Sequence, residues 1–279
     1  MTPGPPASAW TCPSCGCIPA TTGAGFCPGC GEQRLDAPPP RFLSTWQRWK
    51  HSLWELIRHP GQLTADWRDG RRRRQMAPLS LFLAINVVFF VTQSLSGLSV
   101  VSIPLQAHLH DQPHTAVAQE WLDRRLAKLH LDRERFAERF DLQQQTLAKA
   151  SVIAMALPMA LMCALLFRRR KERFQTHWAF ALHFHAYAMA FLIAFFVVLG
   201  LVLRFYTAMH WTIRADNFDA LVSSIQFLIL GSYLYGSARR VHGVGKFIGA
   251  VIALLLFATL VAALYAHRFG VFAVTLHTA

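Results

Sequence analysis

Five long apolar stretches dominate the hydrophobic pattern of the 279-residue chain. An α-helix needs about 20 apolar residues to cross the hydrocarbon core of a bilayer, which is roughly 30 Å thick, and each stretch comes close to that length. The pattern therefore predicts an all-α integral membrane protein with five transmembrane helices. The predicted spans are Leu79–Val101, Ser151–Phe167, Trp178–Phe205, Leu221–Ala238 and Phe247–Ala266.

The distribution of charge between the spans predicts their orientation. The segment 1–78 has a net charge of +5, the link 168–173 adds +4, and the link 239–246 adds +3. The other two links are neutral, and the segment after the fifth span adds only Arg268. Lys and Arg accumulate on the cytoplasmic side of membrane proteins. We therefore expect a cytoplasmic N-terminus and a C-terminus on the opposite side of the membrane.

Composition and charge argue against two other classes of protein. A soluble protein would have to bury five consecutive apolar helices, with 53% of its residues hydrophobic and 15% charged. A nucleic-acid-binding protein would need a basic groove with stacking aromatic side chains in a soluble domain. Topology accounts for the net charge of +13, so nucleic acid is not an expected partner. Residues 1–10 lack the features of a cleaved signal peptide, so the first span is expected to direct insertion.

Five of the six cysteines lie within the first thirty residues. Two CPxCG knuckles with an eleven-residue gap are typical of a zinc ribbon, in which tight turns direct four thiolates toward one tetrahedral ion. A segment this short has no core of its own, so the metal would supply its folding energy. A reducing cytoplasm disfavours the alternative, a pair of disulfides. The predicted ligands of a structural Zn²⁺ ion are Cys12, Cys15, Cys27 and Cys30.

The other two cysteines are interpreted separately. Cys17 is a spare thiol, for which ligand exchange, a redox role and an incidental position stay open. Cys163 lies in the second span and is expected to pack there. Four thiolates leave no open coordination position, so the ribbon is interpreted as a recognition module or a folding nucleus and not as a catalytic centre.

A Pro-rich linker at 35–40 leads to an amphipathic stretch, RFLSTWQRWKHSLWELIRH. Its apolar residues recur at helical spacing while basic residues take the other faces. Tryptophan beside basic residues suits a helix in the headgroup region of a membrane, and a helix packed on a protein partner or on the spans is the alternative. His59-Pro60-Gly61 is expected to end the helix. The apolar positions are Phe42, Trp46, Trp49, Leu53, Leu56 and Ile57.

Several short elements of the chain resemble one family when taken in order. CPSCG and FCPGCGEQR precede LIRHPGQLTADWRDGRRRRQMAPLSLF at the first span, and HWAFALHFHAYAMAF opens the third. Together they resemble the bacterial membrane proteins of domain of unknown function 3667. The resemblance implies a bacterial membrane protein with a zinc ribbon, and it brings no assigned activity. Glu32 and Gln75-Met76 depart from the family pattern. The matching positions are Cys12, Cys15, Cys27, Cys30, Pro60, Gly61, Gly70, Arg72, Pro78, Leu182, His183 and His185.

Two histidines, His183 and His185, stand near the cytoplasmic end of the third predicted span. Ionisable residues inside a membrane are costly and usually face a bundle interior or a wet cavity. Residues two apart point to opposite sides of a helix, so this helix alone does not make a two-histidine metal site. His177 is expected at the membrane interface. Structural histidines bonded to neighbouring helices, a proton or ion relay, a quinone contact and a metal site all stay open.

The long link between the first two spans carries an HxHDxxxH cluster, formed by His108, His110, Asp111 and His114. Its spacing could hold a surface metal ion, and a solvated loop is the alternative. A helix is predicted from Thr115 to Lys149, with an apolar stripe that would pack beside the second span or meet a partner protein. The stripe consists of Trp121, Leu122, Leu126, Leu129, Phe136 and Phe140.

These patterns together predict three parts of the chain. They are a zinc ribbon at 1–34, a Pro-rich linker with an interfacial amphipathic helix at 35–78, and a five-span membrane domain at 79–279 whose helical outer loop covers about 102–149. The sequence holds no phosphate-binding loop, nucleophile elbow, HExxH helix or pair of carboxylates within a span, so no catalytic residues are predicted.

The predicted function is that of a non-enzymatic interaction or regulatory protein anchored in the bacterial inner membrane. Its expected partners are the lipid bilayer and an unidentified protein that meets the ribbon or the amphipathic helix. One alternative is a small oligomeric transporter or channel that uses the histidines of the third span. Another is an enzyme that acts on a lipid or an isoprenoid. Self-association of the chain stays open.

Overall fold

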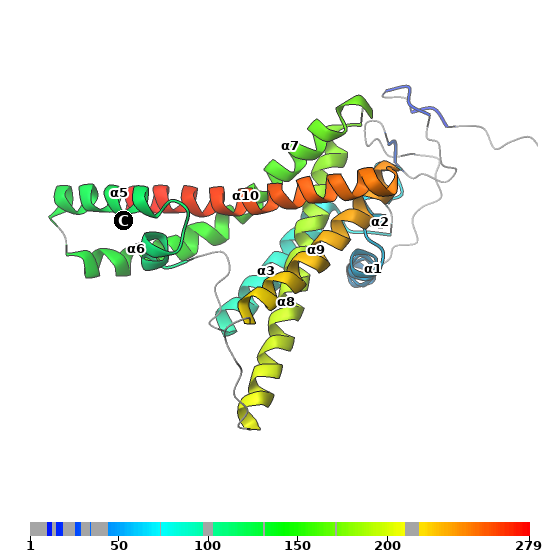
Figure 1. Cartoon of the computed structure of the whole chain (residues 1–279). Coiled ribbons are helices and arrows are strands. Elements are labelled where there is room, and N and C mark those ends of the chain that lie inside the picture. Colours follow the sequence, from blue (N-terminus) through cyan, green and yellow to red (C-terminus); the bar gives the residue numbers. More distant parts are fainter. Residues whose placement is uncertain are drawn as a thin grey trace, which may run out of the picture. The chain divides into compact units, whose positions relative to one another are not determined.

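The computed structural model describes residues 10–12, 15–18, 26–28, 34, 44–72, 74–96, 103–130, 132–170, 172–209 and 218–279. In these ranges the regular structure consists of helices (Figure 1). The helices form two compact units, which we describe separately. The first unit comprises Met1–Phe89 and Cys163–Phe257, and the second comprises Phe90–Met162 and Ala258–Ala279.

Within the described residues, five helices are long and apolar enough to cross a membrane, as the sequence predicts. The second span begins in a polar helix and continues through a short 3₁₀ turn. The second to fifth helices all run beyond their predicted apolar stretches, because the apolar window marks the part that can cross a membrane and not the ends of the helix. The spans are α3 (Pro78–Ser96), α6 (Arg133–Ser151) with η1 (Val152–Met155) and α7 (Ala156–Leu166), α8 (Phe174–Ala208), α9 (Phe218–His242) and α10 (Lys246–Thr278).

Large apolar side chains cover the outer surfaces of these helices. Leu83 and Val87 of α3 are 47% and 63% exposed, Leu201 of α8 is 63% exposed, and Leu254 of α10 is 61% exposed. A water-soluble protein rarely exposes large apolar side chains in such numbers on neighbouring turns. Together with the five apolar helices, this surface fits a multi-pass membrane protein.

In the first unit, side chains of α8 contact both α3 and α9. Helices α1 and α2 lie at one end of this bundle, where α2 contacts both α8 and α9 (Figure 1). Tyr187 of α8 stacks on Tyr233 of α9 with ring centroids 3.6 Å apart. The side-chain amide of Asn86 on α3 lies 3.7 Å from the sulfur of Met189 on α8. The buried side chains of α8 lie between Thr176 and Met189, in the half of the helix that carries its histidines.

In the described part of the chain before the first span, two short helices are present. Helix α1 (Thr45–Arg58) begins with a capping box, in which Ser44 and Gln47 each accept the other's backbone N–H. It ends at His59, and the next turn contains Gly61 with a φ of +80°, as the predicted stop requires. Helix α2 (Gln62–Arg68) follows directly. The sequence pattern does not predict α2, because seven residues are too few to show a helical period.

The second unit has an aromatic core built from α4 (Leu105–His110), α5 (Thr115–Leu129), α6 and the end of α10. The prediction of one helix from Thr115 to Lys149 is wrong, because the chain turns at His130, whose φ is +52°. The predicted apolar stripe is therefore divided between two helices, which pack with α10. The fully buried members of this core are Leu105, Leu109, Ala118, Leu122, Phe136, Phe140, Phe272 and Leu276.

Candidate functional site

The turn between α1 and α2 docks directly on α9. A Cβ atom on Gly61 would lie 2.8 Å from the Cα of Ser237 and 2.9 Å from its carbonyl oxygen, so only glycine allows this approach. A Cβ atom on Gly236 would likewise lie 3.3 Å from the Cβ of Pro60. Arg240 donates a hydrogen bond to the carbonyl oxygen of Pro60 at 3.1 Å. The Pro-Gly turn thus holds α2 against the end of the bundle.

Helix α2 ends in a second turn that positions an arginine. Gly70 has a φ of +79° and ends the helical hydrogen-bond pattern. The guanidinium of Arg72 lies over the ring of Trp67, 4.1 Å from its centroid, and its Nε donates to the Trp67 carbonyl oxygen at 3.1 Å. Arg72 and Trp67 line a groove of about 330 Å³ between α2, α3 and α8, which Trp178 and Leu182 complete on α8. Burial lowers the pKa of Arg72.

Helix α2 also places a threonine on one of the predicted intramembrane histidines. The hydroxyl oxygen of Thr64 lies 2.9 Å from Nδ1 of His183, and the two residues are 1% and 3% exposed. The other ring nitrogen of His183, Nε2, has no hydrogen-bond partner among the described residues. His183 therefore joins α2 to α8 through one nitrogen and leaves the second nitrogen available.

His185 is equally buried but bonds within its own helix. Its Nδ1 lies 2.8 Å from the carbonyl oxygen of Ala181, and its Nε2 has no partner in the described parts of the chain. His183 and His185 thus make separate contacts, as their two-residue spacing predicts. Within the described residues, neither belongs to a group of three side chains that could hold a metal ion.

A third histidine of α8, His177, belongs to a cluster that the sequence does not predict. One ligand-type atom from each of Glu172, His177 and His242 lies within 4.8 Å of the other two. Glu172 stands just before α8, His177 lies in its first turn, and His242 is the last residue of α9. Nδ1 of His242 lies 2.9 Å from Oε2 of Glu172, and the His242 side chain is fully buried. The one available signal in the sequence is that Glu172 is the single acid in a basic link.

Two arginines bind the backbone beside this cluster. Arg68 donates to the carbonyl oxygen of Val241, and Arg170 donates to that of His242. Both carbonyls stand at the C-terminus of α9, where no intrahelical donor is present. Burial raises the pKa of Glu172, but the hydrogen bond and the charge of His242 outweigh it and hold this pKa below its usual range. The Glu172 carboxyl group is therefore ionised at neutral pH.

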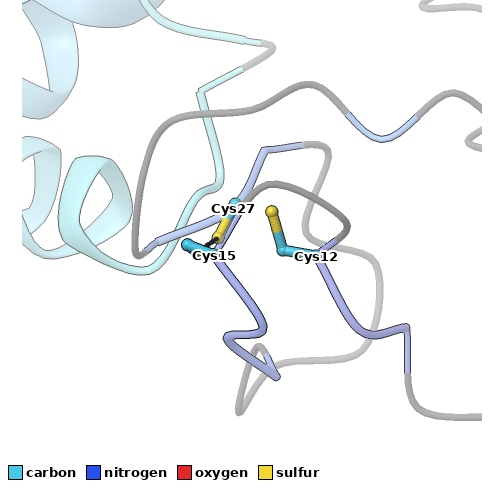
Figure 2. A group of neighbouring side chains, drawn as sticks. All are labelled: Cys12, Cys15 and Cys27. Atoms are coloured by element: carbon cyan, nitrogen blue, oxygen red, sulfur yellow. Dashed lines mark hydrogen bonds between the residues drawn. The ribbon is translucent and has the colours of Figure 1, made fainter.

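Three of the four predicted zinc ligands lie together near the N-terminus (Figure 2). The sulfurs of Cys12, Cys15 and Cys27 lie within 4.8 Å of one another, and those of Cys15 and Cys27 are 3.5 Å apart. An ion with metal–sulfur bonds of about 2.3 Å would hold its ligands about 3.8 Å apart. Gly16, with a φ of +69°, donates its N–H to the Cys12 carbonyl oxygen and closes the first knuckle. The three thiols form a candidate metal site, and Cys30 lies outside the described residues.

Of the other described cysteines, Cys17 lies beside this group and is hydrogen-bonded to Cys27, whereas Cys163 belongs to α7. Burial and the neighbouring Cys27 raise the pKa of the Cys17 thiol, which favours its protonated form. Cys163 is completely buried in α7, as expected for a packed side chain. The described cysteines form no disulfide bond.

The HxHDxxxH cluster lies in the second unit, where it is part of the core and not a solvated loop. His108 is fully buried, and its Nδ1 lies 2.9 Å from Nε2 of His114. Its Nε2 lies 2.8 Å from the side-chain nitrogen of Gln144. Burial and the neighbouring His114 lower the pKa of His108 to about 3. His110 and Asp111 are exposed, so the four residues do not converge on one surface metal site.

Helix α1 has one face fixed to the rest of the first unit. Leu56 and Ser52 are buried, and the Ser52 hydroxyl accepts the backbone N–H of Met76 at 2.8 Å. The guanidinium of Arg48 donates to the carbonyl oxygen of Gln75 at 2.7 Å. These contacts tie α1 to the segment that leads into the first span.

The opposite face of α1 is exposed and combines aromatic with basic residues. Trp46, Trp54 and Ile57 are 62%, 55% and 51% exposed. The ammonium of Lys50 lies 5.3 Å from the ring centroid of Trp46, and the guanidinium of Arg58 lies 4.8 Å from that of Trp54. We refer to these five side chains as the outward stripe.

The model of a family described as Protein of unknown function (DUF3667) matches residues 50–90. The matched stretch runs from the middle of α1 through α2 into α3, and it confirms the resemblance over these residues. It includes the docking turn at Pro60-Gly61, the Arg72 turn and Pro78. The comparisons with curated proteins and with solved structures give no match.

Proposed function

We propose that the protein is a non-enzymatic, membrane-anchored interaction or regulatory protein whose outward stripe binds a protein partner. The observation that carries the proposal is the division of α1 into two faces. Leu56 and Ser52 are buried and Arg48 is bonded to the segment before the first span, whereas Trp46 and Trp54 are more than half exposed. Because the buried face of α1 is already fixed, its exposed face can bind a partner at low entropic cost, since little further ordering is needed.

The chemistry of the outward stripe favours a protein partner. Tryptophan and arginine are enriched among the residues that dominate binding energy at protein interfaces. Each tryptophan of the stripe already carries a cation over its ring, at 5.3 Å for Lys50 and 4.8 Å for Arg58. Such pairs restrict the flexible basic side chains before binding. A lipid headgroup region would also accept this composition, so the decisive observation is whether the stripe contacts protein.

The cysteine cluster adds a second module to the proposal. Zn²⁺ is the metal we propose for Cys12, Cys15 and Cys27, with Cys30 as the fourth ligand. Thiolates alone suit zinc, and a four-thiolate site is closed to substrate, so the role is structural. In this account the ribbon and α1 form the cytoplasmic part of the protein.

The proposed location is the bacterial inner membrane, with the N-terminus in the cytoplasm and the C-terminus in the periplasm. The positive segments 1–78, 168–173 and 239–246 support it. Reporter fusions after Lys149 and Ala279 should be active in the periplasm, and fusions after Arg173 and Arg240 should be active in the cytoplasm. The opposite pattern at both ends would overturn the orientation.

Affinity capture of the intact protein from membranes tests the proposed function. The Trp46→Ala/Trp54→Ala double variant removes the two rings of the stripe. The matched control is Leu201→Ala/Leu228→Ala, which removes two side chains that are 63% and 70% exposed on the spans. We expect a protein that co-purifies with the wild type and with the control variant but not with the tryptophan variant. An identical set of proteins from all three would refute the stripe as a docking surface.

A small oligomeric transporter or channel is the second candidate function. Nε2 of His183, Nε2 of His185 and Nδ1 of His177 have no hydrogen-bond partner in the described residues, and buried imidazoles with an open nitrogen can carry protons. If this function holds, His183→Leu or His185→Leu should abolish proton flux through proteoliposomes that contain the purified protein. Flux that is absent from the wild type would remove this candidate.

A further inference from the structure

We propose that Glu172, His177 and His242 bind one Zn²⁺ ion or a similar first-row divalent metal ion, at a site separate from the N-terminal cysteines. The three residues come from the link before α8, the first turn of α8 and the end of α9. The inference rests on the geometry of this cluster and does not depend on the proposed function.

The ligand set and its spacing fit such an ion. Two imidazoles and one carboxylate form a common three-residue set for zinc and for other first-row divalent ions. Bonds of about 2.0–2.2 Å separate the ligand atoms of a tetrahedral ion by about 3.3–3.6 Å. Here Nδ1 of His242 and Oε2 of Glu172 are 2.9 Å apart, and all three ligand-type atoms lie within 4.8 Å of one another. Small side-chain rotations would bring the set onto one ion.

The two histidines carry unused nitrogens in a buried place. His177 and His242 are 2% and 1% exposed, and Nδ1 of His177 and Nε2 of His242 have no hydrogen-bond partner among the described residues. Buried polar atoms of a native protein are nearly always paired, because an unpaired one costs about 1–3 kcal/mol. An ion bound by the Glu172 carboxylate and by Nδ1 of His242 would pair the orphaned Nδ1 of His177, whereas Nε2 of His242 points away from Glu172 and would not contact that ion.

Neighbouring residues hold the cluster in place. The ring of Phe167 stacks on that of His242 with centroids 3.6 Å apart, and that of Phe180 lies 5.8 Å from it. Apolar and aromatic surroundings of this kind fix ligand orientation and exclude water from a metal site. The cations of Arg68 and Arg170 are engaged by the carbonyl oxygens of Val241 and His242, so they brace the backbone that carries the ligand.

The principal alternative is a buried ion pair between Glu172 and a protonated His242. In that case Glu172 would need no metal, and the nearby His177 would be a packed side chain. The alternative leaves Nδ1 of His177 unpaired, whereas a metal ion would use it. Three protein ligands would also leave a fourth coordination position for water or another small ligand.

Cobalt loading of the full-length protein in detergent distinguishes the two sites. After metal removal with a chelator, Co²⁺ in a thiolate site gives intense sulfur-to-metal charge-transfer absorption, whereas Co²⁺ bound by nitrogen and oxygen gives only weak bands. We expect the wild type to bind cobalt at both sites. Glu172→Gln and His177→Gln should each lose the cobalt that lacks sulfur bands and keep the other. Cys12→Ser should show the reverse.

His185→Gln is the matched control, since it changes another buried histidine of α8 that lies outside the cluster. It should retain both cobalt ions. The proposal is overturned if the wild type binds only cobalt with sulfur bands, or if Glu172→Gln and His177→Gln both keep the wild-type stoichiometry. Since Glu172 is only half-buried, its variant keeps the test valid even where a histidine variant fails to fold.

Discussion

Replacing Gly61 with alanine should release α2 from the bundle. Alanine variants of Gly243 and Gly200 separate the cost of a left-handed backbone from the cost of the close contact. Gly61 combines a φ of +80° with a contact that a Cβ atom cannot enter, 2.8 Å from the Cα of Ser237. Gly243 has a φ of +58°, but its Cβ would meet only the end of the Arg170 side chain at 3.9 Å. Gly200 is helical and has open space.

The expected costs follow from these environments. A left-handed conformation costs a residue with a side chain about 1–2 kcal/mol, so Gly243→Ala should destabilise by that amount. Gly61→Ala adds an overpacking cost of about 1–3 kcal/mol, because backbone atoms of α9 cannot rotate away as a side chain can. Its total should be about 2–5 kcal/mol. Gly200→Ala should be neutral or stabilising by up to about 1 kcal/mol, because alanine favours the helix.

Thermal unfolding in detergent and amide hydrogen exchange measure these effects. About 2–4 °C of melting temperature per kcal/mol predicts a fall of roughly 4–20 °C for Gly61→Ala. Amide hydrogen exchange should accelerate more in α2 (Gln62–Arg68) than in α8 or α9. If Gly61→Ala were no more harmful than Gly243→Ala, the close approach to Ser237 would not hold α2 in place.

Two further predictions concern buried polar groups. Thr64→Val removes the hydroxyl bonded to His183 and should lower the free energy of unfolding by about 1–2 kcal/mol in chemical denaturation. Thr207→Val, on an exposed turn, should change it by less than about 0.5 kcal/mol. Equal effects of the two variants would mean that the Thr64 bond contributes nothing. The pKa of His108 falls from 6.5 to about 3 in the folded state, so the unfolded state binds more protons between these values. The contribution of neutral His108 to the free energy of unfolding is therefore fully present above pH 6.5 and should fall by about 1.4 kcal/mol per pH unit as the pH drops toward 3. His108→Gln should reduce this pH dependence in the same assay. His110→Gln, at an exposed position, should leave it unchanged.

Local patterns of sequence predict the features that depend on neighbouring residues. The five apolar stretches, the helix ending at His59 and the two cysteine knuckles each follow from spacing and composition within a short window. The structure has five described helices that are long and apolar enough to span a membrane, forms α1, and brings Cys12, Cys15 and Cys27 together. The separate contacts of His183 and His185 follow from helical geometry in the same way.

Local sequence patterns do not predict the features that depend on tertiary contacts. Glu172 and His242 lie 70 positions apart, and only the packing of α8 against α9 brings them together. The partner of His183 is Thr64, which belongs to a helix too short to show a period. The break at His130 is a left-handed residue without a glycine, so the sequence carries no turn signal there. For the same reason the buried state of His108 depends on α6 and α10, which the link itself does not reveal.

Photocrosslinking from the outward stripe tests the central claim of a protein-binding membrane anchor most directly. A photoreactive amino acid would replace Trp54, and the same residue at Leu201 would report contact with lipid, since both positions are more than half exposed. We predict that irradiation of intact cells yields a protein adduct from position 54 and only lipid adducts from position 201. Lipid adducts alone from both positions would contradict the account and would assign α1 to the membrane surface.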